Sequence, residues 1–426
     1  MNNKSDIPSA FKNGDTWVTD LQQNAEYMND YYANVGPDTN LSVGTSKKTP
    51  NFYLNKFSER NSENLTFSDF SENDVIEACR NINIKRSSDA YGLSQAIVLD
   101  DIEIIAPIIT HIANCSLKEG ICPDLSKIAR VIPIYKEKGE NYLYSNYRPI
   151  SLIPVFSKIL EKLVYNKIFH FLVRYQILFK SQYGFRCGHS TIHATLDFLK
   201  TIEKALQDNE YAIGIFCDLS KAFDTLDHKV LLDKLDHYGI RGNWHSWLKS
   251  YLSGRMQYVD IHGTKSGTRD IKVGVPQGSI LGPLLFLIYI NDLPASLQKL
   301  TPVLFADDTN LIIKGNNLEQ LQQVINSDLS VLDDFFRANK LKLNAAKTKV
   351  VCFRKKKLAF DNNKLNISID GTQLVPEKNA TFLGMIIDEH LTWEDHCNKV
   401  ANKIARNTGI MNRLKQGQRV TSRVRS

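Results

Sequence analysis

Two adjacent carboxylates, Asp307 and Asp308, lie between two apolar runs at residues 302–305 and 311–313. Apolar runs on either side of a short polar turn predict a β-hairpin. Neighbouring anions repel each other, and partial burial in a hairpin makes their charge still more costly. A bound divalent cation would neutralise that charge, so the turn indicates a metal site. The alternative is an ordinary Asp-Asp turn, because aspartate is a favoured turn residue.

A third carboxylate, Asp218, ends an almost continuous apolar run at residues 211–217. Such a run predicts a strand that is buried on both faces. A lone buried aspartate would be costly, but beside Asp307 and Asp308 it would complete a set of hard oxygen ligands that suits Mg²⁺. Two such ions can activate an attacking hydroxyl and stabilise a leaving pyrophosphate in an in-line displacement. The chemistry implied is nucleotidyl transfer.

Three sequence blocks contain or separate these carboxylates: FCDLSKAFD at 216–224, VPQGSILGP at 275–283 and FADD at 305–308. They resemble motifs A, B and C of reverse transcriptases, in the form found in non-LTR (LINE-type, jockey-like) retrotransposons. Further blocks keep the family order over about residues 60 to 393, at 130–136, 146–152, 182–191, 341–349 and 382–384. Phe305 stands where many family members have tyrosine. Because an aromatic ring is retained, we expect no loss of activity.

The resemblance implies an α+β fold, a right-hand polymerase with fingers, an antiparallel-sheet palm and a partial helical thumb. We expect an N-terminal linker region at 1–58, fingers at 59–209, the palm or reverse transcriptase core at 210–392, and the partial thumb at 393–426. The linker is expected because the first 58 residues are polar and rich in turn residues such as the Gly36-Pro37 pair, although one amphipathic helix could lie at 17–32.

Hydrophobic periodicity refines this outline. Apolar residues at helical spacing predict helices at 152–175, 228–237, 244–252, 281–290 and 318–339, and a thumb helix at 393–414. Period-two patterns predict a hairpin of strands at 256–262 and 271–275, and strands near 349–353, 365–369 and 381–387.

The resemblance also assigns catalytic and metal-binding roles. Asp218, Asp307 and Asp308 would be the catalytic carboxylates. Asp218 and Asp307 are expected to be the principal metal ligands, Asp308 an alternating or more distant ligand, and the backbone carbonyl of Leu219 an additional oxygen. The implied cofactor is Mg²⁺, as two ions, with Mn²⁺ able to substitute.

Six further side chains or backbone positions are implied to bind the incoming nucleotide. Phe223 would be a steric gate against a 2′-hydroxyl, or else a core aromatic. Gln277 and Gly278 would form a loop that approaches the nucleotide and template closely, or else a plain strand-to-helix turn. Pro276 and Gly278 flank Gln277 and would lock the surrounding backbone, which aims the Gln277 amide.

Lys136 and Arg148 match positions that hold the triphosphate, since a point charge and a bidentate fork suit phosphate oxygens. Either could instead belong to a surface ion pair. Lys347 would donate a proton to pyrophosphate, with Lys349 as the alternative. Two other acidic residues, Asp224 and Asp227, are expected to cap the helix that starts near His228 rather than to bind metal.

Charge and cysteine content are consistent with this interpretation. The net charge is +7, and eight basic residues without an acidic one fall both in 340–357 and after residue 395. Such runs are often just solvated faces, but on a polymerase they would follow phosphates. The seven cysteines lack CxxC spacing and no secretory signal is expected, which predicts an intracellular chain, nuclear or cytoplasmic, with free thiols.

The function implied is that of an RNA-directed DNA polymerase, a nucleotidyltransferase with an RNA template, a DNA primer or target and dNTPs as partners. No membrane partner is expected, and the oligomeric state stays open. A group II intron or other prokaryote-like reverse transcriptase is one alternative. A decayed or domesticated RNA-binding fragment of a mobile element is the other, although the intact Asp218, Asp307, Asp308, Gln277 and Gly278 argue against decay of the site.

Overall fold

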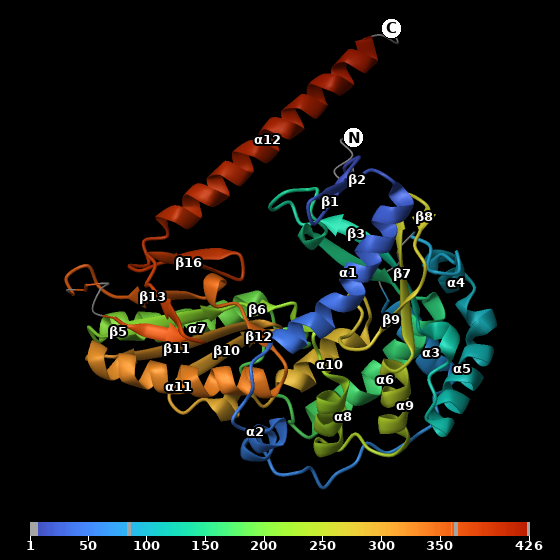
Figure 1. The fold of residues 1–426 in the computed structure, drawn as a ribbon, viewed down its shortest axis with the longest axis horizontal. Coiled ribbons are helices and arrows are strands. Elements are labelled where there is room, and N and C mark those ends of the chain that lie inside the picture. The colour runs from blue at the N-terminus through green and yellow to red at the C-terminus, as the bar shows by residue number, and fades with distance from the viewer. Residues whose placement is uncertain (1–6, 83–86, 359, 362–364, 424–426) are drawn as a thin grey trace. The chain divides into compact units, whose positions relative to one another are not determined.

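The computed structural model describes residues 7–82, 87–358, 360–361 and 365–423, and side chains up to residue 413. The chain forms two compact units whose segments alternate along the sequence (Figure 1). Unit 1 comprises Met1–Phe185, Leu219–Gln298 and Val331–Asn344, and unit 2 comprises Arg186–Asp218, Lys299–Ser330 and Ala345–Ser426. Helices and sheets occur together in both, and most strand pairs are antiparallel although β3 pairs with β7 in parallel, so the expected α+β class is confirmed.

Unit 2 is built on a four-stranded sheet in the order β10-β11-β5-β13. Its strands are β10 (Thr301–Phe305), β11 (Asp308–Gly315), β5 (Tyr211–Cys217) and β13 (Lys349–Phe353), and all neighbours are antiparallel. Every residue of β5 is buried, as its apolar run predicts. Helix α7 (Thr191–Gln207) packs against β5, β10 and β11 and contributes Phe198 and Ile202 to the core.

Unit 2 also contains two hairpins and a long helix. The strands are β14 (Ile367–Ile369), β15 (Thr372–Leu374), β16 (Asn379–Phe382) and β17 (Met385–Asp388), and the helix is α12 (Glu394–Arg423). The single strand expected at 381–387 is therefore wrong. Leu383 and Gly384 have positive φ values of 47° and 93° and form the turn that reverses the chain between β16 and β17.

Unit 1 contains a second sheet in the order β4-β3-β7-β8, with β9 also paired to β7. Its strands are β3 (Ile128–Tyr135), β4 (Tyr147–Leu152), β7 (Arg255–Ile261), β8 (Thr264–Lys265) and β9 (Arg269–Ile271). The strand expected at 271–275 is wrong, because β9 ends at Ile271. Gly274 has a φ of +80°, which turns the chain away from the sheet toward the loop that contains Gln277.

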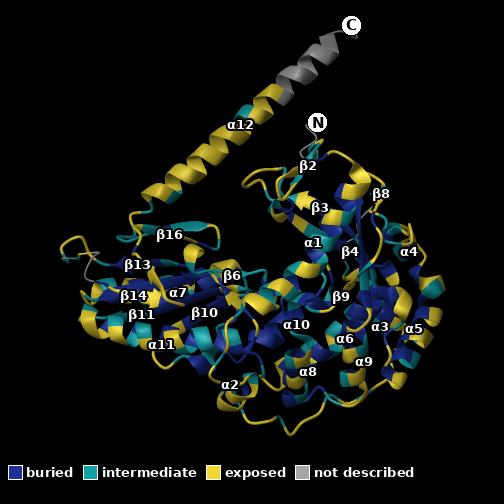
Figure 2. Ribbon diagram, in the orientation of Figure 1, coloured by how far each residue is buried: buried dark blue, intermediate teal, exposed yellow. Residues whose placement is uncertain are grey.

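Helices surround this sheet within unit 1. They are α3 (Glu72–Arg80), α4 (Gln95–Asp100), α5 (Ile102–Glu119), α6 (Val155–Arg174), α8 (His228–His237), α9 (Asn243–Leu252) and α10 (Leu281–Ile290), and α11 (Leu318–Ala338) crosses the boundary between the units. The predicted helices at 228–237, 244–252 and 281–290 are confirmed. Helix α10 is buried along almost its entire length, and it appears dark blue in Figure 2. Of the helices that the structure describes, none combines the length and the apolar character needed to cross a membrane.

Residues 7–58 fold as part of unit 1 where we expected a linker. They form β1 (Phe11–Asn13), β2 (Thr16–Val18), α1 (Leu21–Ser42) and α2 (Pro50–Phe57). Phe11, Met28 and Tyr32 join Val131 and Val259 in one hydrophobic cluster, so this segment completes the core around β3 and β7. The Gly36-Pro37 pair, expected in a turn, lies inside α1.

Candidate active site

The Asp307-Asp308 turn is a two-residue hairpin between β10 and β11. Phe305 pairs with Asp308, which leaves Ala306 and Asp307 as the turn residues. Ala306 has a φ of 55°, in the left-handed region that tight hairpins require at their first turn position. The predicted hairpin is confirmed, and it puts two successive carboxylates at one end of the sheet.

Asp218 reaches the same end of the sheet through the register of β5 and β11. Cys217 pairs with Thr309, so one further step of that register sets Asp218 opposite Asp308. The three predicted catalytic aspartates are therefore neighbours within unit 2. They come from the ends of adjacent strands whose positions are fixed by backbone hydrogen bonds.

The electrostatics of this cluster reflect unbalanced negative charge. Burial and, to a smaller extent, the charges of Asp307 and Asp218 together raise the pKa of Asp308 from 3.8 to about 6. Burial likewise raises the pKa of Asp307, and the charge of Asp218 adds to that shift. A cation at this end of the sheet would stabilise the ionised carboxylates.

Lys347 flanks Asp218 from the other side of β5. Lys349 of β13 pairs with Phe216, and Lys347, at the end of the 3-10 turn before that strand, has its Nζ 3.6 Å from Oδ2 of Asp218. Lys349 instead forms an ion pair with Glu377. Both members of the Lys347–Asp218 pair are substantially exposed, so the pair contributes little to stability. Of the two lysines considered, Lys347 lies at the carboxylates.

The donor set of the cluster suits a hard divalent ion, because it consists of carboxylate oxygens. Among the residues that the structure describes, however, no three His, Cys, Asp or Glu side chains already converge closely enough to hold an ion. An ion would therefore have to draw the carboxylates together or use backbone oxygens as well. Leu219, whose carbonyl is expected to serve in this way, begins β6 (Leu219–Ser220), directly after Asp218.

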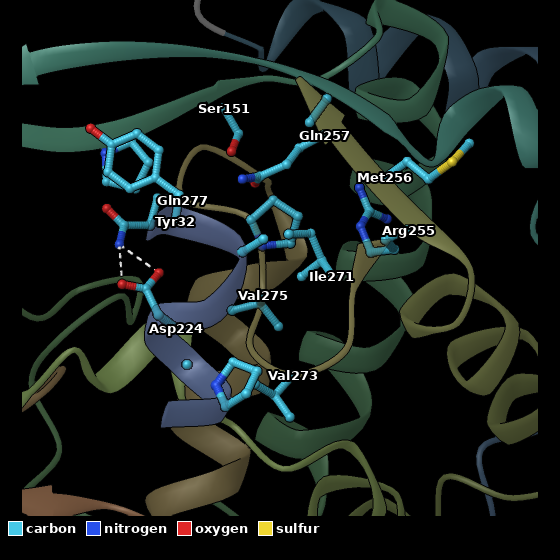
Figure 3. Close-up of a pocket in the computed structure, with 16 residues that line it drawn as sticks. Tyr32, Ser151, Asp224, Arg255, Met256, Gln257, Ile271, Val273, Val275 and Gln277 are labelled. Carbon is cyan, nitrogen blue, oxygen red and sulfur yellow. Dashed lines mark hydrogen bonds between the residues drawn. The ribbon is translucent and has the colours of Figure 1, made fainter. Parts of the chain in front are cut away.

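Gln277 lies in unit 1, in the loop between β9 and α10. Its Nε2 donates to both carboxylate oxygens of Asp224, at 2.8 and 3.0 Å (Figure 3). Its carbonyl accepts from the backbone N–H of Ser151 at 2.9 Å. Side chain and backbone of Gln277 are thus both held in place.

Gly278 is required by the same loop. Its φ is +129°, and a Cβ atom there would lie 2.6 Å from the carbonyl oxygen of Ser151. The close approach that demands glycine in this structure is therefore made to β4 (Tyr147–Leu152). The expected approach of Gly278 to nucleotide and template stays a prediction.

The expectation that Asp224 caps a helix is wrong. Asp227 is the cap of α8 and accepts from the Val230 N–H at 3.0 Å. Asp224 instead accepts two hydrogen bonds from Gln277 and is partly buried. Burial raises the pKa of Asp224, whereas the Gln277 hydrogen bonds and the charges of Lys221 and Lys136 lower it.

The other predicted nucleotide-binding residues also belong to unit 1. Phe223 is partly exposed and stacks on Phe286, with ring centroids 4.8 Å apart. Arg148 is exposed on β4 opposite Ile134. Lys136, two residues beyond Ile134, donates through Nζ to the carbonyl of Ser145. Because strand side chains alternate with a period of two, Lys136 and Arg148 emerge on the same face of this strand pair.

Comparison with known proteins decides the family. The model of the family "Reverse transcriptase (RNA-dependent DNA polymerase)" matches residues 134–387, which is more than half of the chain. This chain is a member of the reverse transcriptase family. The match contains all three motif blocks, so the resemblance seen in the sequence is confirmed.

Similar proteins come from insect mobile elements. The chain is 31% identical over 337 residues to a probable RNA-directed DNA polymerase from transposon BS of Drosophila melanogaster, covering 76% of this chain and 36% of that protein. It is 28% identical over 330 residues to the RNA-directed DNA polymerase from mobile element jockey of the same species, covering 72% and 35%. The chain thus spans about a third of the length of these relatives.

One residue that supports the Gln277 loop of this reverse transcriptase was not predicted from the sequence. Glu161 of α6 is buried, and its Oε2 accepts from the N–H groups of Ile280 and Leu281 at 2.6 and 3.2 Å. A carboxylate is well placed at the start of α10 because the first N–H groups of a helix lack partners within the helix. Burial raises the pKa of Glu161, and the charge of Arg255 lowers it.

A sequence signal for Glu161 did exist. It is an acidic residue on the apolar face of a predicted helix, between Leu160 and Leu163. A charge at such a position is almost never fully buried without partners. Its partners, however, lie about 120 residues further along the chain. The helical pattern alone could not identify them.

Proposed function

We propose that this chain is an RNA-directed DNA polymerase of non-LTR retrotransposon type, which adds dNTPs to a primer 3′-hydroxyl on an RNA template. The observation that carries the proposal is the cluster of Asp218, Asp307 and Asp308 at one end of the unit 2 sheet. The raised pKa values of Asp307 and Asp308 mark it as a site of unbalanced negative charge. Perturbed carboxylates of this kind are common at catalytic centres.

Divalent metal ions serve reverse transcriptases generally, and the proposal assigns Mg²⁺, as two ions, to this cluster. Asp218 and Asp307 would be its principal ligands, with Asp308 and the Leu219 carbonyl as further oxygens. When bound, the ions supply charge neutralisation at the reacting phosphate and activation of the attacking hydroxyl. The aspartates orient the reactants, and that positioning accounts for much of the rate enhancement in such sites.

The proposal gives the other site residues complementary tasks. Lys347 would hold the proton that passes to the leaving pyrophosphate. Lys136 and Arg148 would bind triphosphate oxygens from one face of the β3–β4 pair, and Phe223 would exclude a 2′-hydroxyl. Gln277 and Gly278 would face the nucleotide and template.

In the proposed right-hand arrangement, residues 59–209 form the fingers, 210–392 the palm and 393–426 belong to the thumb. The thumb would begin with α12, whose Lys399, Lys403 and Arg406 are exposed. Exposed cations spaced along a helix suit contacts with nucleic acid phosphates.

The direct test is primer extension. The purified chain would be given poly(rA) annealed to oligo(dT), dTTP and Mg²⁺, with EDTA and Mn²⁺ reactions in parallel. Extension that requires the divalent ion is expected. Binding of the template–primer without any extension, under conditions where Asp307→Asn and the unaltered chain behave alike, would favour the RNA-binding alternative instead.

A further inference from the structure

Asp224 and Gln277, both in unit 1, form a partly buried contact between the motif blocks 216–224 and 275–283. The contact is a charge-assisted pair of hydrogen bonds from one amide nitrogen to both carboxylate oxygens, at 2.8 and 3.0 Å. An ionised carboxylate only accepts hydrogen bonds, so it selects the nitrogen end of the carboxamide. The Oε1 end of Gln277 must then point away from Asp224, as the close-up in Figure 3 shows.

The backbone of Asp224 is held as firmly as its side chain. A Cβ atom on Gly36 of α1 would lie 2.1 Å from the Asp224 carbonyl oxygen, and one on Gly274 would lie 2.6 Å from the same atom. The N–H of Gly274 donates to Leu226, and that of Val275 donates to Phe223. Two glycines thus enclose the residue, and two backbone hydrogen bonds join its turn to the loop that leads into Gln277.

We propose that Asp224 is a positioning residue, which fixes the Gln277 carboxamide so that Oε1 is the atom presented to the substrates. Gln277 then acts as a preset acceptor for a sugar hydroxyl. That hydroxyl belongs either to the incoming dNTP, as its 3′-OH, or to the RNA template, as a 2′-OH. This inference rests on the proposed polymerase function but adds a residue and a hydrogen-bond polarity to it.

A preset acceptor has a physical advantage over a free glutamine. A mobile carboxamide presents oxygen or nitrogen to its ligand and loses conformational entropy when it binds. Anchoring by Asp224 removes that cost in advance and excludes the wrong end of the amide. The consequence is that the effect of Asp224 on the substrates passes entirely through Gln277.

A double-mutant cycle tests this dependence. Extension of the rA template–primer with dTTP is measured as kcat and KM for the unaltered chain, Asp224→Ala, Gln277→Ala and the double variant. Each single variant is expected to lose about 10- to 100-fold in kcat/KM, the range for a hydrogen bond to a charged group. The kcat/KM of the double variant is expected to be no lower than that of Gln277→Ala, because both substitutions remove the same interaction with the substrate.

Two further variants separate positioning from folding. Asp224→Asn keeps an acceptor oxygen of nearly the same shape and should recover most of the activity that Asp224→Ala loses. Asp227→Asn is the matched control, since it weakens the cap of α8 three residues away. It should lower the melting temperature and leave kcat/KM unchanged. Losses that multiply in the double variant, or an Asp224→Ala enzyme of normal kcat/KM, would overturn the proposal.

Two comparisons identify the hydroxyl. If Oε1 accepts from the dNTP, Asp224→Ala and Gln277→Ala lose the preference for dTTP over ddTTP. If it accepts from the template, they lose the preference for an rA over a dA template. An unchanged preference in both comparisons would contradict the acceptor role.

Substrate capture can also be measured without chemistry. With a dideoxy-terminated primer, the dTTP concentration that stabilises the ternary complex against a competing template–primer is determined for the four proteins of the cycle. If the unaltered chain captures dTTP but does not extend a normal primer, the polymerase function is contradicted. The double-mutant cycle can still be read from dTTP capture in that case. If Asp224→Ala and Gln277→Ala weaken dTTP capture independently of each other, the inference itself is contradicted.

Discussion

The ammonium of Lys347 lies 3.6 Å from Oδ2 of Asp218, and Lys349, two residues further on, pairs with Glu377. Lys349 is the first residue of β13, which pairs with β5. Lys347 lies before that strand, at the end of the 3-10 turn Ala345–Lys347, so the alternation of side chains along a strand does not apply to the two lysines. A cation therefore adjoins the carboxylates, although the sequence could not decide between the two lysines.

We predict that Lys347→Ala lowers kcat by about 100-fold, within the range for loss of a general acid, with a smaller change in KM. The matched Lys349→Ala variant should keep kcat near that of the unaltered chain. Measurement of kcat between about pH 6 and pH 9 supplies the control, because loss of a general acid removes the alkaline limb of the profile. Equal losses in both variants would show that Lys347 acts only through general charge.

The second prediction concerns the pH dependence of stability without metal. The pKa of Asp308 is raised to about 6 in the folded chain, so its ionised form opposes folding above that pH. As pH falls from about 8 through 6 toward 4, the folded state takes up this proton before the unfolded state does, and the group's destabilising effect disappears. Asp308→Asn should therefore raise the melting temperature at about pH 8 and have a smaller effect at about pH 5.

Mg²⁺ provides the control for that measurement. A ligand that binds only the folded state raises its stability. Mg²⁺ should raise the melting temperature of the unaltered chain at pH 8, and should raise that of Asp308→Asn less. An Asp308→Asn protein that is less stable than the unaltered chain at pH 8 would contradict the charge-repulsion account.

A third prediction addresses Phe223, whose ring stacks on Phe286 yet keeps an exposed part. Phe223→Val should raise the incorporation of UTP relative to dTTP by about tenfold or more, because the excluded 2′-hydroxyl gains room. Competition between UTP and dTTP on the rA template measures the ratio. If discrimination is unchanged in a variant with a normal melting temperature, Phe223 belongs only to the core.

A fourth prediction tests the N-terminal segment. Gly36→Ala would improve helix propensity in α1 by about 1 kcal/mol. The added Cβ, however, would lie 2.1 Å from the Asp224 carbonyl and 2.8 Å from Val273. Overpacking against a fixed backbone costs about 1–3 kcal/mol, so the net effect should be destabilising and should lower activity together with stability.

Gly44→Ala is the matched control for that substitution. Its Cβ would meet only the guanidinium end of Arg337, at 2.4 Å, and that flexible side chain can move aside. Denaturant unfolding of both variants should separate them clearly. A Gly36→Ala protein as stable as Gly44→Ala would show that α1 does not press on Asp224.

The catalytic carboxylates could be predicted because their signals are local. Asp307 and Asp308 adjoin each other, and Asp218 directly follows a strand that is recognisable from its apolar run. Strand pairing then brings the third carboxylate to the first two. The N-terminal segment could not be predicted in the same way. Phe11 and Tyr32 are scattered among polar residues, and a Gly-Pro pair usually indicates a turn, whereas Gly36 serves close packing against Asp224.

The contacts that support Gln277 were missed for a different reason. Asp224 and Asp227 both precede a helix and matched the same capping pattern, and only the fold separates them. The partner of Asp224 lies 53 residues away, and the N–H groups that Glu161 accepts from are about 120 residues away. Local propensity carries no information about such pairs.

The measurement that tests the central claim most directly is single-turnover extension by Asp307→Asn. Extension of a dT primer on rA template with Mg²⁺ and dTTP is compared with template–primer binding by the same protein. Asp208→Asn serves as the matched control, since it removes a carboxylate that pairs with Lys314, six residues along β11 from Asp308. The account predicts normal binding by both variants, near-normal extension by Asp208→Asn, and a loss of at least about 100–1,000-fold for Asp307→Asn. Extension by Asp307→Asn at a rate close to that of the unaltered chain would contradict it.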